Sequence, residues 1–358
     1  MKHIVFEAYA LLHPYVGVGE FCRQLGSRLG KRAAELRDRH GIEFSFILPP
    51  RLQGCFGREV RYLCLPVPLR HLLAAWPGPA DLFHMPHQYC LFKNLRCARH
   101  RLMTVHDVNF MYEKEGHKQR RAIRRFQHKL DRIDHVNYIS RFAQADTCRH
   151  FHTELPGRVI YNGATDLSGM ETARPARFGQ LPENFLFHIS SLQPKKNVAL
   201  LIDMMRYLPE EKLVIAGDWQ GNHGQALRQK IDALPTRNVL ALPNVSEPEK
   251  AWLYSACKAF LYPSLCEGFG LPPVEAMYFG KPVFLSTLTS LPEIGGKEAF
   301  YWETLLPRPM AEKLAETLAR PGTLADPKAE ALKRRAARFD WDTCTEQYIR
   351  YYLEILGS

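Results

Sequence analysis

The second half of the chain alternates short apolar runs with amphipathic stretches, and this alternation restricts the fold more than any other feature. Ser246 and Glu249 add a capping-box pattern at the start of one amphipathic stretch. The predicted strands are 185–189, 212–216, 239–242, 260–263 and 283–286, and the predicted helices lie near 197–208, 225–234, 247–257, 272–279 and 311–320. Strands that alternate with helices in this way predict a parallel, doubly wound sheet.

The first half shows a rougher version of the same pattern. A chain of 358 residues fits two domains of ordinary size. We therefore predict an α/β protein with two Rossmann-like domains, 1–165 and 183–341, a Gly- and Pro-containing linker at 166–182, and a terminal helix at 342–356 that returns to the first domain. The strands predicted in the first half are 3–9, 43–48, 60–68, 81–84, 101–105, 136–140 and 158–161, with a helix from 21 to 34.

The charge of the chain is concentrated in its first half. The formal net charge is +11, and residues 1–165 hold 26 Lys and Arg against 14 Asp and Glu. This imbalance indicates an anionic partner for the first half. An anionic membrane surface, a phosphorylated glycolipid and nucleic acid are the three candidates.

The helix predicted at 117–135 carries much of this charge. Its apolar residues recur at three- and four-residue spacing, and its other face is basic, with Lys118, Arg120, Arg121, Arg124, Arg125, Lys129 and Arg132. A basic amphipathic helix is typical of contact with an anionic membrane or acceptor, although a solvated helix face has the same pattern. Nucleic acid is disfavoured because aromatic side chains do not interleave with these cations.

The cysteines and the N-terminus bear on the compartment. Nine scattered cysteines include no Cys-x-x-Cys pair, and this pattern is typical of reduced thiols in a cytosolic protein. No uncharged apolar run approaches the length of a spanning helix, and Glu7 interrupts the only apolar stretch near the N-terminus. We expect a cytoplasmic protein, with contact at the inner face of a membrane as a further expectation.

The stretch from Ser264 to Ala276 holds the strongest chemical signal. A buried strand is followed by a loop with Gly268 and Gly270, and then by a helix whose first turn contains two prolines. The free N–H groups of a helix start favour a phosphate, and glycines allow close approach of a ligand. Two nearby carboxylates, Glu267 and Glu275, suit hydroxyl groups of a sugar or ribose. A tight turn with acidic residues near a helix dipole would give the same pattern without a ligand.

Three further segments follow predicted strands and are candidate ligand sites. Lys195 and Lys196 enter a helix after the strand at 185–189, where a lysine can stabilise a leaving diphosphate. Gly17 and Gly19 form a Gly-x-Gly before the helix at 21–34, and His106 follows the strand at 101–105. His84 and His87 lack a Cys or carboxylate cluster, so we predict plain polar residues there and no metal site. Asp340-Trp341-Asp342 is interpreted as a helix start capped by Asp342.

The chain resembles the retaining, nucleotide-sugar-dependent glycosyltransferases of family 4, which have the GT-B fold. Residues Glu267 to Ala276 match their E-G-F-G-L-P-x-x-E-A signature, and Gly280-Lys281-Pro282-Val283 and Ser290-Leu291-Pro292-Glu293 continue the match. The resemblance implies two Rossmann-like domains facing a cleft. It implies that Lys196 is the phosphate-binding lysine, that Lys195 replaces an arginine, and that His106 lies near the transferred sugar. Gly17-Val18-Gly19-Glu20 departs from the Gly-Ile-Gly-Arg of many members.

From this resemblance we expect a metal-independent retaining hexosyltransferase without a cofactor, of mannose or glucose type, acting in lipopolysaccharide, capsule or other surface-glycan assembly. The expected partners are a nucleotide-sugar donor and a glycan or glycolipid acceptor. Glu267, Lys196 and His106 are the expected catalytic residues. Glu275, Gly268, Phe269, Gly270, Leu271, Lys195, Gly17 and Gly19 are expected to bind the donor. Two alternatives remain: an inactive partner subunit of the same fold, and a sugar phosphorylase that uses pyridoxal phosphate.

Overall fold

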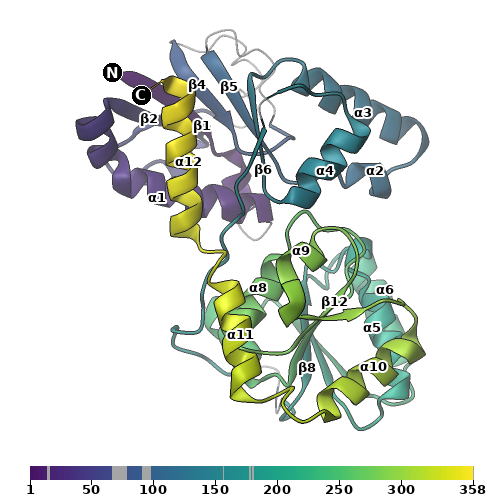
Figure 1. Ribbon diagram of the computed structural model, residues 1–358. Coiled ribbons are helices and arrows are strands. Elements are labelled where there is room, and N and C mark those ends of the chain that lie inside the picture. The colour runs from purple at the N-terminus through teal and green to yellow at the C-terminus, as the bar shows by residue number, and fades with distance from the viewer. Residues whose placement is uncertain are drawn as a thin grey trace. The chain divides into compact units, whose positions relative to one another are not determined.

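A computed structural model describes residues 1–13, 17–66, 79–90, 98–155, 157–176, 179 and 181–357 of the chain. The chain divides into two compact units (Figure 1). The first contains Met1–Gly163 together with Trp341–Ser358, and the second contains Ala164–Asp340. Within the described ranges, no helix is both long enough and apolar enough to cross a membrane.

The first unit is built on a parallel sheet whose described strands follow the order β3-β2-β1-β4-β5-β6-β7. The first strand pairs with both β2 and β4, so the strand order reverses between β1 and β4. In such a sheet, ligands bind at the carboxyl ends of the strands beside this reversal. The strands are β1 Lys2–Glu7, β2 Ile42–Leu48, β3 Arg61–Cys64, β4 Ala80–Met85, β5 Ala98–Val105, β6 His135–Tyr138 and β7 Gly157–Val159.

Two long helices, α1 and α12, pack together against one face of this sheet and share its apolar core (Figure 1). A second group of helices lies beside β6, where the aromatic rings of Phe110, Phe126 and Phe151 pack together. The helices of the first unit are α1 Gly17–His40, α2 Phe110–Glu113, α3 Gly116–Leu130, α4 Arg141–His150 and α12 Trp341–Leu356, with short 3-10 turns at Tyr9–Leu12 and Pro50–Leu52.

Buried polar contacts fasten α12 to the sheet. The Tyr348 hydroxyl lies 3.1 Å from Thr104 Oγ1 and accepts a hydrogen bond from Asn137 Nδ2 at 2.6 Å. His84 connects Tyr352 and Thr104 through its two ring nitrogens, at 2.7 and 2.9 Å. Because burial lowers the pKa of His84 to about 3, its ring stays neutral at neutral pH. The terminal helix is therefore part of the core of the first unit.

The second unit has a parallel sheet whose described strands follow the order β10-β9-β8-β11-β12-β13. Its strand order reverses between β8 and β11, since β8 pairs with both β9 and β11. The two sheets confirm the predicted α/β architecture of two parallel-sheet domains. The strands are β8 Leu186–Ser190, β9 Leu213–Gly217, β10 Val239–Pro243, β11 Ala259–Tyr262, β12 Val283–Ser286 and β13 Phe300–Trp302.

Helices cover the sheet of the second unit. The helices α5, α6 and α10 share one apolar core with residues of β8, β9 and β11, whereas Tyr254 of α7 packs on Phe187 and Phe260. These helices are α5 Val198–Met204, α6 Asn222–Asp232, α7 Glu247–Ala256, α8 Leu271–Tyr278, α9 Leu291–Gly295, α10 Pro307–Ala319 and α11 Asp326–Ala336, with 3-10 turns at Pro194–Lys196, Met205–Tyr207 and Gly296–Glu298. The capping box of Ser246 and Glu249 is confirmed.

Several boundaries differ from the sequence predictions. The helix predicted at 117–135 ends at Leu130, and Asp342 lies in the first turn of α12, where it pairs with Arg28 and does not act as the cap. The segment predicted as a linker at 166–182 lies within the second unit: Leu167 and Leu181 are buried, and the Ala173 N–H donates to the Pro248 carbonyl. This hydrogen bond, and Arg174, whose guanidinium carbon lies 5.4 Å from the centre of the Trp252 ring, hold the segment against α7, which composition alone does not indicate.

Candidate active site

The carboxyl ends of β8 and β11 lie side by side at the strand reversal of the second sheet, and the two signature segments follow them directly. Lys196 lies in the 3-10 turn Pro194–Lys196 after β8, and Glu267 lies in the loop after β11. The Lys195 carbonyl accepts a hydrogen bond from the Leu265 N–H at 2.8 Å and lies 3.1 Å from Ser264 Oγ. These contacts hold the two loops together at the predicted ligand edge of the sheet.

Lys196 and Glu267 form a buried ion pair at this edge. Lys196 Nζ lies 2.5 Å from Glu267 Oε1, with only 12% and 11% of the two side chains exposed. Lys196 also donates to the Tyr262 hydroxyl at 2.9 Å, and Ser264 Oγ donates to Glu267 Oε1 at 2.6 Å. Each charged group is thus hydrogen-bonded by the protein, which a buried ion pair requires to be stable.

The environment of Glu267 keeps its carboxylate ionised. Burial raises the pKa of the Glu267 carboxyl, but the charge and hydrogen bond of Lys196, the Ser264 hydroxyl and the charge of Lys195 together outweigh burial and lower it. Burial also raises the pKa of the Tyr262 hydroxyl well above its usual value, so this hydroxyl stays protonated. The Glu267 carboxylate is therefore a fixed anion that can accept hydrogen bonds from hydroxyl groups of a ligand.

Hydroxyl side chains from the loop after β12 position the backbone around Glu267. The Glu267 N–H donates to Thr289 Oγ1 at 3.0 Å, and Ser290 Oγ lies 3.0 Å from both the Glu267 and Phe269 carbonyls. Gly270 has a φ of +105°, a conformation that favours glycine, and it directly precedes α8. The glycine at this position is thus needed for the turn into the helix.

Glu275 lies directly after the first turn of α8, because the helix begins at Leu271 and its first turn holds no acidic residue. Lys250 Nζ lies 3.0 Å from Glu275 Oε1, and the Tyr254 hydroxyl donates to Glu275 Oε2 at 2.9 Å. Tyr262 is within electrostatic reach of both Glu267 and Glu275. The second unit therefore brings together Lys195, Lys196, Glu267, the segment 268–271 and Glu275.

Gly17 and Gly19 do not lie in a loop, because α1 begins at Gly17. The preceding loop residues 14–16 lie outside the described residues. A Cβ at Gly19 would fall 2.1 Å from the His13 carbonyl oxygen, whereas a Cβ at Gly17 would meet no atom of the described residues within 4 Å. The glycine at position 19 is thus required by packing inside the chain.

His106 lies directly after β5, as expected, and is buried. Its Nε2 donates to the Pro86 carbonyl at 2.9 Å, and its backbone N–H donates to Gln88 Oε1 at 3.2 Å. Burial lowers the pKa of His106 to about 4, so the ring is neutral. These contacts show His106 fixing the loop after β4.

Lys129 holds the same loop. Its ammonium donates to the Gln88 carbonyl at 2.6 Å and to the Cys90 carbonyl at 2.5 Å, and burial lowers its pKa. The sequence pattern placed Lys129 on the exposed basic face of the helix. The structure differs, because the Lys129 side chain folds back over the loop after β4. The sequence gives no signal that distinguishes it from its exposed neighbours.

Glu7 and His87 are a further pair that the sequence did not indicate. Glu7 ends β1 and His87 follows β4, so both lie at the strand reversal of the first sheet. Their side chains approach to 3.5 Å between Oε2 and Nε2. Both His84 and His87 were predicted as plain polar residues, and His84 lies inside β4, in agreement with the strand predicted at 81–84.

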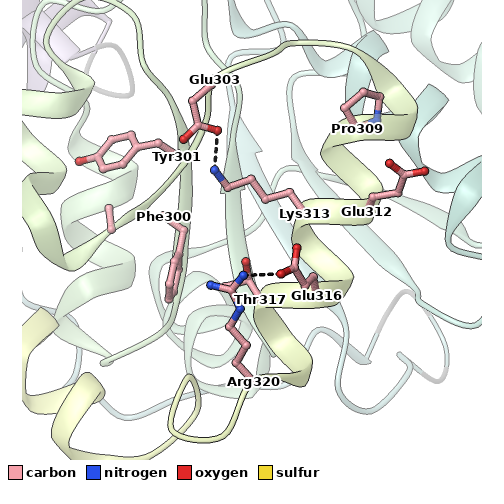
Figure 2. Close-up of a pocket in the computed structure, with 10 residues that line it drawn as sticks. Phe300, Tyr301, Glu303, Pro309, Glu312, Lys313, Glu316, Thr317 and Arg320 are labelled. Atoms are coloured by element: carbon pink, nitrogen blue, oxygen red, sulfur yellow. Dashed lines mark hydrogen bonds and ion pairs between the residues drawn. The ribbon is translucent and has the colours of Figure 1, made fainter.

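A cavity of about 580 Å³ lies between β13 and α10 in the second unit (Figure 2). None of the candidate site residues Lys196, Glu267 and Glu275 lines it. Figure 2 shows ion pairs of Glu303 with Lys313 and of Arg320 with Glu316 along its wall. All four side chains are at least one-third exposed, which is typical of surface pairs. Across the described ranges, no three His, Cys, Asp or Glu side chains gather as a metal site.

Comparisons with known proteins indicate the class of protein to which this chain is similar. The family model described as glycosyl transferases group 1 matches residues 171–338. The chain is 25% identical to O-antigen chain mannosyltransferase B of Escherichia coli, over 98% of this chain and 99% of that protein. It is 27% identical to O-antigen chain mannosyltransferase RfbU of Salmonella typhimurium, over 57% of this chain and 56% of that one.

Solved structures show the same fold. Sucrose-phosphate synthase from Thermosynechococcus elongatus superposes with a TM-score of 0.77 at 18% identity, over 100% of both chains. Anabaena Alr3699/HepE, solved in complex with UDP and glucose, superposes with a TM-score of 0.75 at 20% identity, over 98% of this chain and 99% of that chain.

The two parallel-sheet units and these comparisons define a glycosyltransferase of the GT-B fold. The match to the glycosyl transferases group 1 model lies within its second unit, which holds the ion pair of Lys196 and Glu267. The resemblance noted in the sequence is therefore confirmed.

Proposed function

We propose that this glycosyltransferase moves a hexose, of mannose or glucose type, from a nucleoside-diphosphate sugar to a glycan or glycolipid acceptor in surface-glycan assembly. The observation that supports it most is the buried cluster of Lys196, Glu267, Tyr262 and Ser264 at the strand reversal of the second sheet. The O-antigen mannosyltransferases among its relatives support the acceptor class and the mannose-type donor.

The proposed donor site lies in the second unit. Lys196, with Lys195 beside it, stabilises the diphosphate as it leaves, and the N–H groups at Gly268 to Leu271 face the same anion. Glu267 accepts hydrogen bonds from hydroxyls of the sugar, and Glu275 accepts them from the ribose. Gly17, Gly19 and His106 belong to the proposed acceptor side in the first unit.

The proposed reaction retains the anomeric configuration. The acceptor oxygen forms the new bond to the anomeric carbon on the same face from which the diphosphate oxygen departs. The acceptor proton passes to the departing diphosphate, so no covalent enzyme intermediate and no cofactor are required. Protein cations and the start of α8 supply the positive charge at the diphosphate, which makes the proposed reaction independent of a metal ion.

The configuration of the product tests the retaining mechanism. We expect proton NMR of the product to show the same anomeric configuration as the donor, and chelation with EDTA to leave the rate unchanged. An inverted product would overturn the retaining mechanism. A rate that falls with EDTA and recovers with a divalent cation would overturn metal independence.

The proposed location is the cytoplasm, with contact to an anionic membrane through α3. Six cations on and just after this helix are exposed and form no ion pair with any described residue: Lys118, Arg120, Arg121, Arg124, Arg125 and Arg132. The apolar residues Phe126 and Leu130 are buried in the first unit, so they are not available for insertion into a bilayer. The proposed contact is therefore electrostatic.

We expect the protein to sediment with phosphatidylglycerol vesicles at 50 mM salt and to be released at 500 mM, because screening weakens such attraction. Replacing Arg120, Arg121, Arg124 and Arg125 with glutamine should abolish binding. The matched control replaces Arg308, Lys313, Arg320 and Lys333, which are cations of the second unit in ion pairs, and should bind as the wild type does. Equal loss in both variants would contradict a role for α3.

A further inference from the structure

The carboxylate of Glu275 is held from a neighbouring helix by two side chains. Lys250 and Tyr254 lie four residues apart on α7, so they share one face of that helix. Lys250 Nζ contacts Glu275 Oε1 at 3.0 Å, and the Tyr254 hydroxyl donates to Glu275 Oε2 at 2.9 Å. One partner on each oxygen fixes both the position and the rotation of the carboxylate.

Tyr254 is suited to act as a donor here. Its side chain is fully buried, and burial, followed by the charge of Glu275, raises the pKa of its hydroxyl well above the usual value. The hydroxyl therefore remains protonated. The Pro272 carbonyl in the first turn of α8 lies 3.3 Å from the same hydroxyl, so Tyr254 also contacts the start of the helix that carries Glu275.

The remaining hydrogen-bonding capacity of Glu275 fits two hydroxyl groups. A carboxylate has about four acceptor positions, two on each oxygen. Lys250 and Tyr254 each use one position on a different oxygen, which leaves acceptor capacity on both. About one-fifth of the Lys250 side chain and 12% of the Glu275 side chain remain exposed, so a ligand can reach them.

We propose that Lys250 and Tyr254 are positioning residues that orient Glu275 so that its two oxygens accept hydrogen bonds from the 2′- and 3′-hydroxyls of the donor ribose. The proposal rests on the proposed function, because it assigns Glu275 to the ribose of a nucleoside-diphosphate sugar. It adds a basis for selecting ribonucleotide over deoxyribonucleotide donors. The competing explanation is that the two contacts only fasten α7 to α8.

The test compares kcat/KM for a nucleoside-diphosphate sugar with kcat/KM for its 2′-deoxy and 3′-deoxy analogues. We expect the wild type to prefer the ribonucleotide by about 10-fold to 100-fold for each missing hydroxyl, the range expected for a hydrogen bond to a charged group. Lys250→Met should reduce this preference to below about 3-fold, since an unrestrained carboxylate no longer fits both hydroxyls. Tyr254→Phe should reduce it as well, and Lys250→Arg should retain most of it.

A matched control is available two residues beyond α7. Lys258 forms an ion pair with Glu211 in the same unit, with 2.5 Å between the charged atoms. About one-quarter of each of these two side chains is exposed. Lys258→Met removes the same kind of contact without touching Glu275 and should leave the ribose preference unchanged. Thermal unfolding of all variants shows which of them are folded, and Tyr254→Phe provides a second test if Lys250→Met does not fold.

Two results would overturn the proposal. If the Lys250 and Tyr254 variants lose kcat/KM equally for all donors, so that the ribose preference is unchanged, the contacts only fasten the two helices. If the wild type transfers sugar but shows no preference for the ribonucleotide donor, Glu275 does not bind the ribose hydroxyls. The proposed function would still stand. If the wild type turned over no nucleoside-diphosphate sugar, this result would contradict the proposed function and therefore also this proposal.

Discussion

Replacing Lys196 with methionine lowers kcat by about 100-fold to 1,000-fold, the loss expected when one preorganised group that stabilises a leaving anion is removed. Lys196 is the cation paired with Glu267 at the strand reversal, and methionine keeps much of its length without its charge. The substitution also leaves the Glu267 carboxylate buried without its main counter-charge, which costs about 3–5 kcal/mol of unfolding free energy. Activity and stability are therefore both expected to fall.

A double variant separates these two effects. Lys196→Met combined with Glu267→Gln has no unpaired buried charge, so its unfolding free energy should recover most of the loss while its activity remains low. Lys230→Met is the control, because Lys230 pairs with Asp203 at 2.7 Å in the same unit and lies in α6, away from β8 and β11. Wild-type turnover by a folded Lys196→Met protein would contradict the assignment of Lys196.

Replacing Tyr348 with alanine destabilises the first unit by about 3–5 kcal/mol, the usual cost of removing a large buried aromatic side chain. Tyr348 is fully buried in α12, and its hydroxyl accepts a hydrogen bond from the Asn137 side chain. Truncation leaves both a cavity and an unsatisfied amide. Urea unfolding followed by circular dichroism measures the change in unfolding free energy.

Two further variants locate the origin of this loss. Tyr348→Phe keeps the ring and should cost about 1–3 kcal/mol, because only the buried hydrogen bonds are removed. Tyr207→Ala is the control in the second unit, where half of that side chain is exposed, and it should change stability by less than about 0.5 kcal/mol. A loss below 1 kcal/mol for Tyr348→Ala would contradict the inclusion of α12 in the core of the first unit.

Most strands could be predicted from the sequence because buried parallel strands are continuous apolar runs. The run at 283–286 is a strand with the same bounds in the structure, and the other runs of the second unit agree within about one residue. The strand β13 Phe300–Trp302 was not predicted, because three residues at a sheet edge give too short a pattern. The helices α9 and α11 were also not predicted.

The residues of the donor segment could be found from sequence, but their pairing could not. A lysine at 196 and a glutamate at 267 are separated by 71 residues, and only the order of β8 and β11 in the sheet brings them together. The same holds for Glu275, whose partners Lys250 and Tyr254 lie on the preceding helix. Gly19 shows a second limit of the sequence pattern, because a glycine near a helix start fits a ligand site and a close backbone contact equally well, and only the structure shows the contact with His13.

Ligand-induced stabilisation tests the central claim most directly. Thermal unfolding is measured with UDP, GDP, ADP and their common sugar conjugates, alongside the Glu275→Gln variant. We predict that the nucleotides of one base stabilise the wild type by about 2.7 kcal/mol at 100 times their dissociation constant, and stabilise the variant less at the same concentration. Absence of stabilisation by every nucleotide would contradict a donor site in the second unit and would favour an inactive partner subunit of the same fold.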